Sequence, residues 1–151
     1  MIVTELSKGI KLYLLVGGRG TRLSSVTNGL PKPLVDINGK PFISRVLENL
    51  SGFDITLVCS NLNYEYFKKF DVEVFNEGEL SGTGGFLSKI NLPQSFYVMN
   101  GDTFYSGDIN LDCEKTTIFV REEKIKGDEG YVVGNDRSEE HTSELQSRQY
   151  L

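Results

Sequence analysis

Short apolar runs alternate with polar, glycine-containing segments over the first hundred residues. Four of these runs have the length and composition of buried strands: Ile10–Val16, Ile55–Cys59, Val72–Phe75 and Phe96–Met99. The run Leu34–Ile37 predicts one more short strand, and the Asn38-Gly39 pair that follows it is typical of a tight turn.

The segments between these runs have the pattern of helices. Pro41 opens one that extends to about Leu50, with apolar residues on one face at Phe42, Val46, Leu47 and Leu50. Tyr64–Phe70 and Thr83–Ile90 predict two more, the second entered through glycines. Thr116–Arg121 and Tyr131–Val133 are candidates for later strands.

Strands that alternate with helices predict the α/β class, with a Rossmann-like, mainly parallel sheet covered by helices on both faces. Ligands of such folds bind beyond the carboxyl ends of the strands. Two motifs follow strands directly: the glycine-rich stretch VGGRGTRL at 16–23 and NGD at 100–102. We therefore expect both to reach one crevice.

Composition narrows the classes of function. The chain has 151 residues, 38% of them hydrophobic and 25% charged, which is the profile of a soluble globular domain. Its net charge of −5 argues against a nucleic-acid partner, which would require a basic face. No apolar run is long enough for a membrane span, and the N-terminus lacks the pattern of a signal peptide. Cys59 and Cys113 have no metal-like spacing, so we expect reduced, packed thiols in a cytoplasmic protein.

The last residues have a different character. From Arg137 the chain is RSEEHTSELQSRQYL, which is polar and aperiodic and contains the only histidine, His141. Arg137–Ser147 can be encoded by a sequence that resembles a common short-read sequencing adapter. A solvated natural tail is the alternative. We predict that residues 136–151 are a non-native, disordered tail without a site.

The stretch VGGRGTRL has the composition of a phosphate-binding loop. Glycines let backbone amides approach an anion closely, and Arg22 and Lys32 would add positive charge. A glycine-rich turn with incidental surface cations fits the loop alone equally well. The dinucleotide pattern GxGxxG fails because Leu23 occupies its last position, and no Gly-Lys-Ser/Thr completes a Walker motif.

The complete set of motifs is more specific. GGRGTRL followed by PKPLV, then GKPF at 39–42, SGTGG at 81–85 and NGDTF at 100–104, resembles the signature of the sugar-phosphate nucleotidyltransferases. The resemblance covers about residues 10 to 134 and implies a nucleotide-diphospho-sugar transferase fold. Two residues depart from the usual pattern: Val16 stands where alanine is common, and Arg19 stands where a small or apolar residue is usual. Within the family, the motifs are most similar to heptose 1-phosphate and mannose-1-phosphate guanylyltransferases.

The resemblance implies transfer of a nucleotidyl group from an NTP to a sugar 1-phosphate, with release of pyrophosphate. It implies that phosphates are cradled by Gly17, Gly18, Gly20 and Thr21. Arg22 would hold the pyrophosphate, Lys32 would bridge the α-phosphate and the sugar phosphate, and Asp102 would bind Mg²⁺. The alternative interpretation is that Arg22 and Lys32 are ordinary surface residues and that Asp102 caps a turn. Asp108 is a weaker candidate ligand.

The nucleobase is assigned to the segment around SGTGG. By the resemblance, Gly82 and Thr83 belong to the loop against the base, and Glu77 stands where relatives that use dTTP commonly have glutamine. A carboxylate can accept from both N1–H and the N2 amino group of guanine, so we predict GTP. CTP is the nearest rival, and a solvated Glu77 is the structural alternative.

Three functions stay open: guanylyl transfer, thymidylyl, uridylyl or cytidylyl transfer on the same fold, and a non-catalytic nucleotide-binding regulatory subunit. The presence of Arg22, Lys32 and Asp102 together disfavours the last, since a binder needs no metal ligand aligned with an attacking phosphate. We predict that residues 1–135 are the nucleotide-binding part of a longer domain. A second metal ligand and most sugar-binding residues would then lie beyond it, and the 151-residue chain itself would be inactive. The sugar is not identified, and a homo-oligomer stays open.

Overall fold

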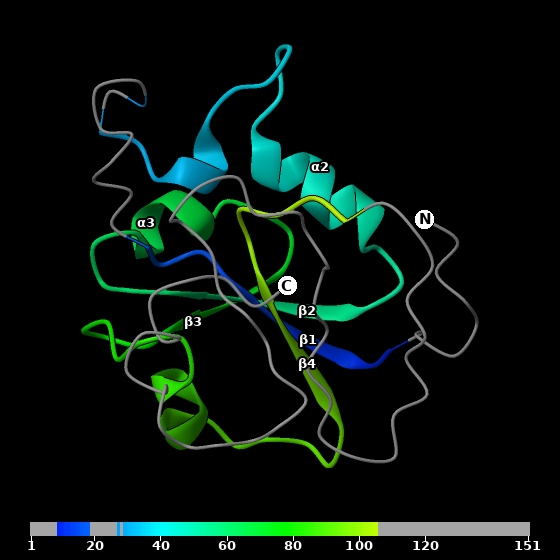
Figure 1. Cartoon of the computed structure of the whole chain (residues 1–151), viewed down its shortest axis with the longest axis vertical. Helices are drawn as coiled ribbons and strands as arrows, with labels where there is room; N and C mark the ends of the chain where they lie inside the picture. The colour runs from blue at the N-terminus through cyan, green and yellow to red at the C-terminus, as the bar shows by residue number, and fades with distance from the viewer. Residues whose placement is uncertain (1–8, 19–26, 28, 106–151) are drawn as a thin grey trace, which may run out of the picture. The chain divides into compact units, whose positions relative to one another are not determined.

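In the computed structural model, the described residues are 9–18, 27 and 29–105. They form a four-stranded parallel sheet in the order β3-β2-β1-β4 (Figure 1). The strands are β1 (Lys11–Leu15), β2 (Asp54–Cys59), β3 (Glu73–Asn76) and β4 (Phe96–Asn100). The predicted α/β architecture with a parallel sheet is confirmed, and all four predicted buried strands are present to within one or two residues.

The register of the sheet brings all carboxyl ends of the strands together. β1 pairs with β2 from Lys11↔Asp54 to Leu15↔Val58, and with β4 from Lys11↔Phe96 to Leu15↔Asn100. Because the strands are parallel and aligned, the segments that follow β1, β2, β3 and β4 leave the sheet at the same end. This carboxyl end is where a fold of this type binds its ligands.

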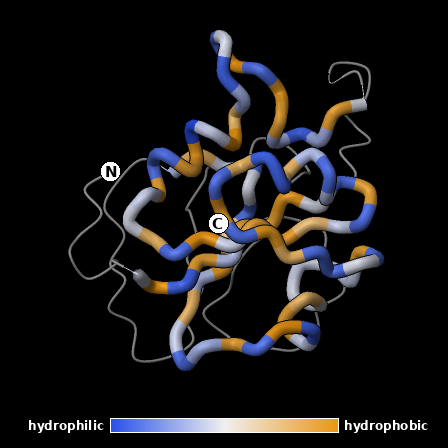
Figure 2. Tube along the Cα trace, turned by 180° about the vertical axis from the view of Figure 1, so that it is seen from behind, coloured by the Kyte–Doolittle hydropathy of each residue, from blue (hydrophilic) through white to orange (hydrophobic). Residues whose placement is uncertain are grey.

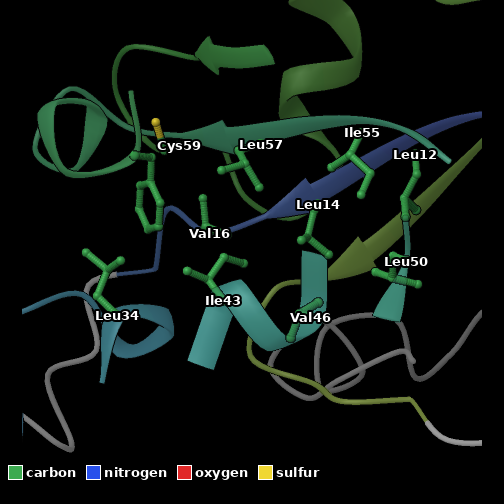
Figure 3. Packing of buried hydrophobic residues seen from close by; sticks show 11 residues of the cluster. Leu12, Leu14, Val16, Leu34, Ile43, Val46, Leu50, Ile55, Leu57 and Cys59 are labelled. Carbon is green, nitrogen blue, oxygen red and sulfur yellow. The ribbon is translucent and has the colours of Figure 1, made fainter. Parts of the chain in front are cut away.

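One face of the sheet carries the larger part of the core. Alternate residues of the central strands, Leu12 and Leu14 of β1 with Ile55 and Leu57 of β2, point to this face. Helix α2 (Phe42–Asn49) packs on them through Ile43, Val46 and Leu50 (Figure 3). Helix α3 (Tyr64–Phe67) adds the buried Phe67.

The opposite face carries a smaller cluster. Tyr13 of β1 and Val58 of β2 are buried with Phe86 of the 3-10 helix η4 (Gly85–Lys89). The rings of Tyr13 and Phe86 lie 5.4 Å apart between centroids. Figure 1 shows α2 and α3 on one side of the sheet and the short green helix η4 on the other. Figure 2 shows hydrophobic residues concentrated in the central strands. Helices on both faces are thus confirmed.

Helix α2 follows the prediction closely. Pro41 caps it, and the backbone amide of Leu50 closes its last turn. The buried face consists of Ile43, Val46 and Leu50, whereas Phe42 and Leu47 are only partly buried. The predicted face was therefore rotated by about one residue and omitted Ile43.

The predicted strand Leu34–Ile37 was wrong. Lys32–Leu34 forms a 3-10 helix, η3, closed by a bond from Leu34 N to the Pro31 carbonyl at 2.8 Å. The chain then enters a tight hairpin with one isolated bridge, Asp36↔Pro41. Pro31 and Pro33 each lack an amide donor, and their fixed φ is compatible with the 3-10 turn, so they favour η3 over a paired strand at Lys32–Leu34.

Two helices are shorter than predicted. α3 ends at Phe67 instead of Phe70, and the predicted helix Thr83–Ile90 is the 3-10 helix η4, which begins at Gly85. Consecutive glycines at 84 and 85 disfavour an α-helical start, because glycine loses the most backbone entropy on ordering. The turn at Asn38-Gly39 is confirmed, with φ of 53° and 78°. The later candidate strands, the boundary near residue 135 and the predicted tail lie outside the described residues.

Candidate active site

Backbone hydrogen bonds continue past the ends of the strands and order the segments that follow. Val16 N donates to Val58 O at 2.9 Å, Glu77 N to Cys59 O at 2.9 Å, and Gly101 N to Leu15 O at 2.8 Å. Residues at the carboxyl end of the sheet are therefore held by the ladder itself. A functional side chain at this end is therefore held in position by the core.

Gly101 is the tightest of these positions. A Cβ atom at this residue would lie 2.5 Å from Val16 Cγ1 and 2.9 Å from the Leu15 carbonyl oxygen. No side chain fits against that backbone, so glycine allows β4 to end directly beside the end of β1. Asp102 follows immediately and is thereby placed next to the glycine-rich segment.

Lys32 and Asp102 meet at this end of the sheet. Lys32 Nζ donates to Asp102 Oδ2 at 2.7 Å, across a separation of 70 residues in the sequence. The side chain of Lys32 is 40% exposed and that of Asp102 is 26% exposed, so solvent reaches both. Thr103 Oγ1 lies 3.4 Å from Asp102 Oδ1. Lys32 and Asp102 were both predicted as site residues, and the structure brings them together as an ion pair.

The position of Lys32 follows from its flanking prolines. Pro31 and Pro33 fix the backbone of η3, while Pro33 and Leu34 are buried against the core. Leu34 lies in the same cluster as Val16 at the end of β1. A short rigid helix with an apolar anchor therefore presents a long, flexible ammonium side chain towards β4.

Gly17 and Gly18 follow β1 in different environments. A Cβ at Gly17 would lie 3.2 Å from both Cys59 Cα and Ser60 N and 3.1 Å from Leu80 Cδ2, so this residue is packed between β2 and the loop after β3. Gly18 is exposed, with open space where a Cβ would be. The other predicted residues of this loop, Gly20, Thr21 and Arg22, lie outside the described residues.

The loop after β3 is ordered by its own polar side chains. Glu77 Oε2 accepts from Ser81 Oγ at 2.6 Å and from Ser81 N at 3.3 Å. Lys89 Nζ donates to the carbonyl oxygens of Glu77 at 2.8 Å and Glu79 at 3.3 Å. Gly82 has a φ of 80°, and the side chain of Thr83 is exposed. Glu77 is thus a structural organiser of the loop, whatever it binds.

Glu77 and Asp102 lie at opposite sides of the sheet. They follow β3 and β4, which are separated by β2 and β1, so three strand spacings amount to roughly 14 Å. Gly17 lies just after β1, one of the two strands between them. The structure therefore does not bring Glu77 into contact with Lys32 and Asp102, but it sets all three along one end of the sheet.

A depression of about 530 Å³ lies beside Gly17 and is lined by Gly17, Gly29, Ser60, Leu62, Asn63 and Tyr66. The hydroxyl of Ser60 is buried there without a hydrogen-bond partner in the described chain. Nearby, burial and then the negative charge of Glu77 raise the pKa of the Cys59 thiol to about 11. Cys59 is a free, packed thiol, as predicted, whereas Cys113 lies outside the described residues.

Sequence reasoning missed three residues that position this end of the sheet: Ser81, Lys89 and Asn49. Asn49 Nδ2 donates to the Tyr105 carbonyl oxygen at 2.8 Å and so ties the segment after Asp102 to the end of α2. No local pattern indicates the contacts of Lys89 and Asn49, because they join residues that are distant in the sequence. Ser81 lies only four residues after Glu77, and this short separation is the sequence signal for their contact.

A family model described as MobA-like NTP transferase domain matches residues 12–107. The matched range covers the four strands except for Lys11, the first residue of β1, and it includes Lys32, Glu77 and Asp102. No helix of the described residues is both long and apolar enough to cross a membrane.

The curated relatives have names that agree with this match. D-glycero-alpha-D-manno-heptose 1-phosphate guanylyltransferase of Campylobacter jejuni is 34% identical over 67% of this chain and 51% of its own length. Mannose-1-phosphate guanyltransferase of Emericella nidulans is 31% identical over 82% of this chain and 37% of its own. The chain therefore spans about half, or less, of the length of these relatives.

Among solved structures, HddC from Yersinia pseudotuberculosis is similar to this chain. The sequences are 37% identical, the match covers 62% of this chain and 48% of the other, and the TM-score is 0.51. This likeness supports the α/β fold described above.

Proposed function

Because the chain belongs to the MobA-like NTP transferase domain family, we propose that its natural protein transfers a nucleotidyl group from an NTP, with GTP preferred, to a sugar 1-phosphate. The observation that carries this proposal is the contact between Lys32 and Asp102 at the carboxyl end of the sheet, where Gly101 packs against the end of β1. Two oppositely charged side chains from distant loops, next to a glycine-rich segment, fit the demands of a phosphoryl-transfer site.

The proposed reaction needs no covalent intermediate. An oxygen of the sugar phosphate attacks the α-phosphorus, the bond from this phosphorus to the oxygen bridging the α- and β-phosphates breaks, and pyrophosphate leaves with the electron pair. Negative charge develops on the non-bridging and leaving oxygens, so the protein contributes position and electrostatic stabilisation. Lys32 supplies positive charge at the α-phosphate, and Arg22 supplies it at the leaving group. Backbone amides of Gly17, Gly18, Gly20 and Thr21 bind the remaining oxygens.

The residues around Asp102 fit a magnesium ion. Mg²⁺ prefers oxygen ligands and usually takes one or two carboxylates, with waters and substrate phosphates completing its shell. Asp102 offers one accessible carboxylate, and Thr103 a neighbouring hydroxyl. In the described part of the chain, no group of three or more histidine, cysteine or acidic residues could hold a metal without substrate. When bound, Mg²⁺ would neutralise charge on the phosphates.

The preference for GTP rests on Glu77. Its carboxylate has about four acceptor positions, so the bonds from Ser81 leave acceptor capacity for the two adjacent donors of guanine. Glu77 and Asp102 follow strands that are three spacings, roughly 14 Å, apart, which leaves room for the ribose between base and phosphates. The curated relatives named above are guanylyltransferases, which supports the same base.

The test is turnover of the full-length natural protein. Pyrophosphate release is measured with GTP, CTP, UTP, dTTP and ATP, each with mannose 1-phosphate and with a heptose 1-phosphate. We expect release only in the presence of a sugar 1-phosphate and a divalent cation, and fastest with GTP. A preference for CTP or dTTP would correct the base. Nucleotide binding without any turnover would favour a regulatory subunit.

A further inference from the structure

The ion pair between Lys32 and Asp102 engages one oxygen of the carboxylate that would bind a metal. We infer that Lys32 is the counter-ion of Asp102 in the nucleotide-free protein, so that a divalent cation enters together with the NTP and not before it. This inference rests on the proposed function, since it assigns the order in which that site is filled. Its evidence is the 2.7 Å contact from Lys32 Nζ to Asp102 Oδ2.

The contact disfavours a metal on electrostatic grounds. The ammonium group lies at hydrogen-bond distance from Oδ2, so its positive charge would repel a divalent ion at the same carboxylate. Within the described part of the chain, Lys32 is the one basic side chain paired with Asp102. Removing it would therefore leave this carboxylate uncompensated and open to cations.

A triphosphate would reverse this arrangement. The α-phosphate gives Lys32 a second anion to pair with, and its oxygens supply further ligands to the cation beside Asp102. Lysine suits such an exchange, because its four-carbon stem is flexible and its charge is compact. Both side chains remain partly exposed, so neither contact is locked into the core. The same lysine thus protects the carboxylate first and serves the phosphate afterwards.

The test measures metal binding without nucleotide and without turnover. Mn²⁺ is titrated into the protein, and the free ion is followed by electron paramagnetic resonance. We expect Lys32→Met to bind Mn²⁺ about tenfold more tightly than the wild type, as removal of a repelling unit charge in a solvated site allows. Lys40→Met is the matched control, because Lys40 pairs with Glu48 elsewhere on the surface. Thermal unfolding of each variant verifies its fold.

Two further measurements fix the interpretation. Adding Asp102→Asn to Lys32→Met should abolish the gain in Mn²⁺ affinity, and GTP should strengthen Mn²⁺ binding to the wild type. Equal Mn²⁺ affinity in the wild type and Lys32→Met, or a gain that survives Asp102→Asn, would overturn the inference. A wild-type protein that binds Mn²⁺ as expected but never turns over contradicts the proposed function instead, so the two failures are distinguishable.

Discussion

The sheet has a charged cluster at each end, and the two clusters are built differently. At the amino end, Lys11, Asp54 and Glu73 are the first residues of three adjacent strands. Lys11 Nζ lies 3.2 Å from Asp54 and 2.7 Å from Glu73, and Glu73 also accepts from Thr56 Oγ1 at 2.6 Å. The strand register therefore sets every member of this cluster.

At the carboxyl end, the charges come from segments beyond the strands. Lys32 stands on a short 3-10 helix, Asp102 follows β4, and one contact of 2.7 Å joins them. Each partner has one charged neighbour in the described chain, whereas Lys11 has two. By our proposal the pair at the carboxyl end exchanges its partner for a ligand, whereas the charged residues at the amino end are held in place by the strands that carry them.

The difference teaches that residue type alone does not mark a site. Lysine and acidic residues form both clusters, but only the one at the carboxyl end combines partly exposed charges with a close glycine approach. We therefore expect substitutions at the two ends to affect different measurements. Changes at the carboxyl end should act on turnover, and changes at the amino end on stability.

The largest effect is expected for the charges at the carboxyl end. Lys32→Ala and Arg22→Ala should each lower kcat about 10²–10³-fold, the scale of losing one transition-state charge contact. Asp102→Ala should remove most Mg²⁺-dependent turnover. Steady-state kinetics of the full-length protein provide the measurement, with Lys11→Ala as the matched control. Near-normal kcat in all three variants would reject their assigned roles.

Gly101→Ala is expected to destabilise the protein by about 3 kcal/mol, because the new methyl group would overlap Val16 and the Leu15 carbonyl. Urea unfolding gives the free energy. Gly18→Ala is the control, since its Cβ would meet open space. Equal stability of the two variants would mean that β4 does not need glycine to end beside β1.

Glu77→Gln should reduce the preference for GTP. A glutamine cannot accept from two adjacent donors as a carboxylate does, so we expect a loss of selectivity of about tenfold, within the 1–3 kcal/mol of one base contact. The ratio of kcat/KM for GTP to that for CTP and dTTP is measured in the wild type and the variant. Glu79→Gln is the control on the same loop. An unchanged ratio in Glu77→Gln would exclude Glu77 from base recognition.

Glu73→Gln should lower stability by about 0.5 kcal/mol at neutral pH, a small value because Glu73 is mostly exposed. The hydrogen bond from Lys11, followed by that from Thr56, lowers the pKa of the Glu73 carboxyl group. Burial lowers the pKa of Lys11, but its bonds to Glu73 and Asp54 outweigh this effect and raise it overall.

The sign of the pH dependence follows from these directions. A lowered carboxyl pKa contributes stability that is present above the ordinary value of 4.5 and is lost as the pH falls through the lowered value. The raised pKa of Lys11 contributes stability that is present below 10.5 and lost as the pH rises through the raised value. The stability difference between the wild type and Glu73→Gln should therefore shrink below pH 4.5, as urea unfolding at several pH values can measure. A difference that grows there would contradict the assignment.

The sequence predicted the sheet well because its strands are apolar and buried. Apolar side chains such as Leu12, Leu14 and Leu57 are stable only when they are buried, so the hydrophobic pattern and the structure agree. The prediction failed at Leu34–Ile37, where the prolines at 31 and 33 decide the backbone in spite of apolar side chains. Local propensity and hydrophobic pattern conflict at this segment, and local propensity wins.

The site was predictable only where a motif marks it. Lys32 and Asp102 stand in recognisable motifs, and the end of the sheet where they meet follows from the parallel topology. Their direct contact did not follow, because it depends on how Leu34 of η3 packs in the core cluster that contains Val16. The bonds from Ser81 and Lys89 to Glu77 were missed for a similar reason, since only the folded loop brings them together.

The most direct measurement of the central claim compares two double variants of the full-length protein. Lys32→Met/Asp102→Asn neutralises the pair at the carboxyl end, and Lys11→Met/Glu73→Gln neutralises the matched pair at the amino end. Pyrophosphate release from GTP and a sugar 1-phosphate should fall at least about 10³-fold in the first variant and stay within about threefold of the wild type in the second. Equal rates in the two variants, or a larger loss in the second, would contradict the assignment of the active site to the carboxyl end of the sheet.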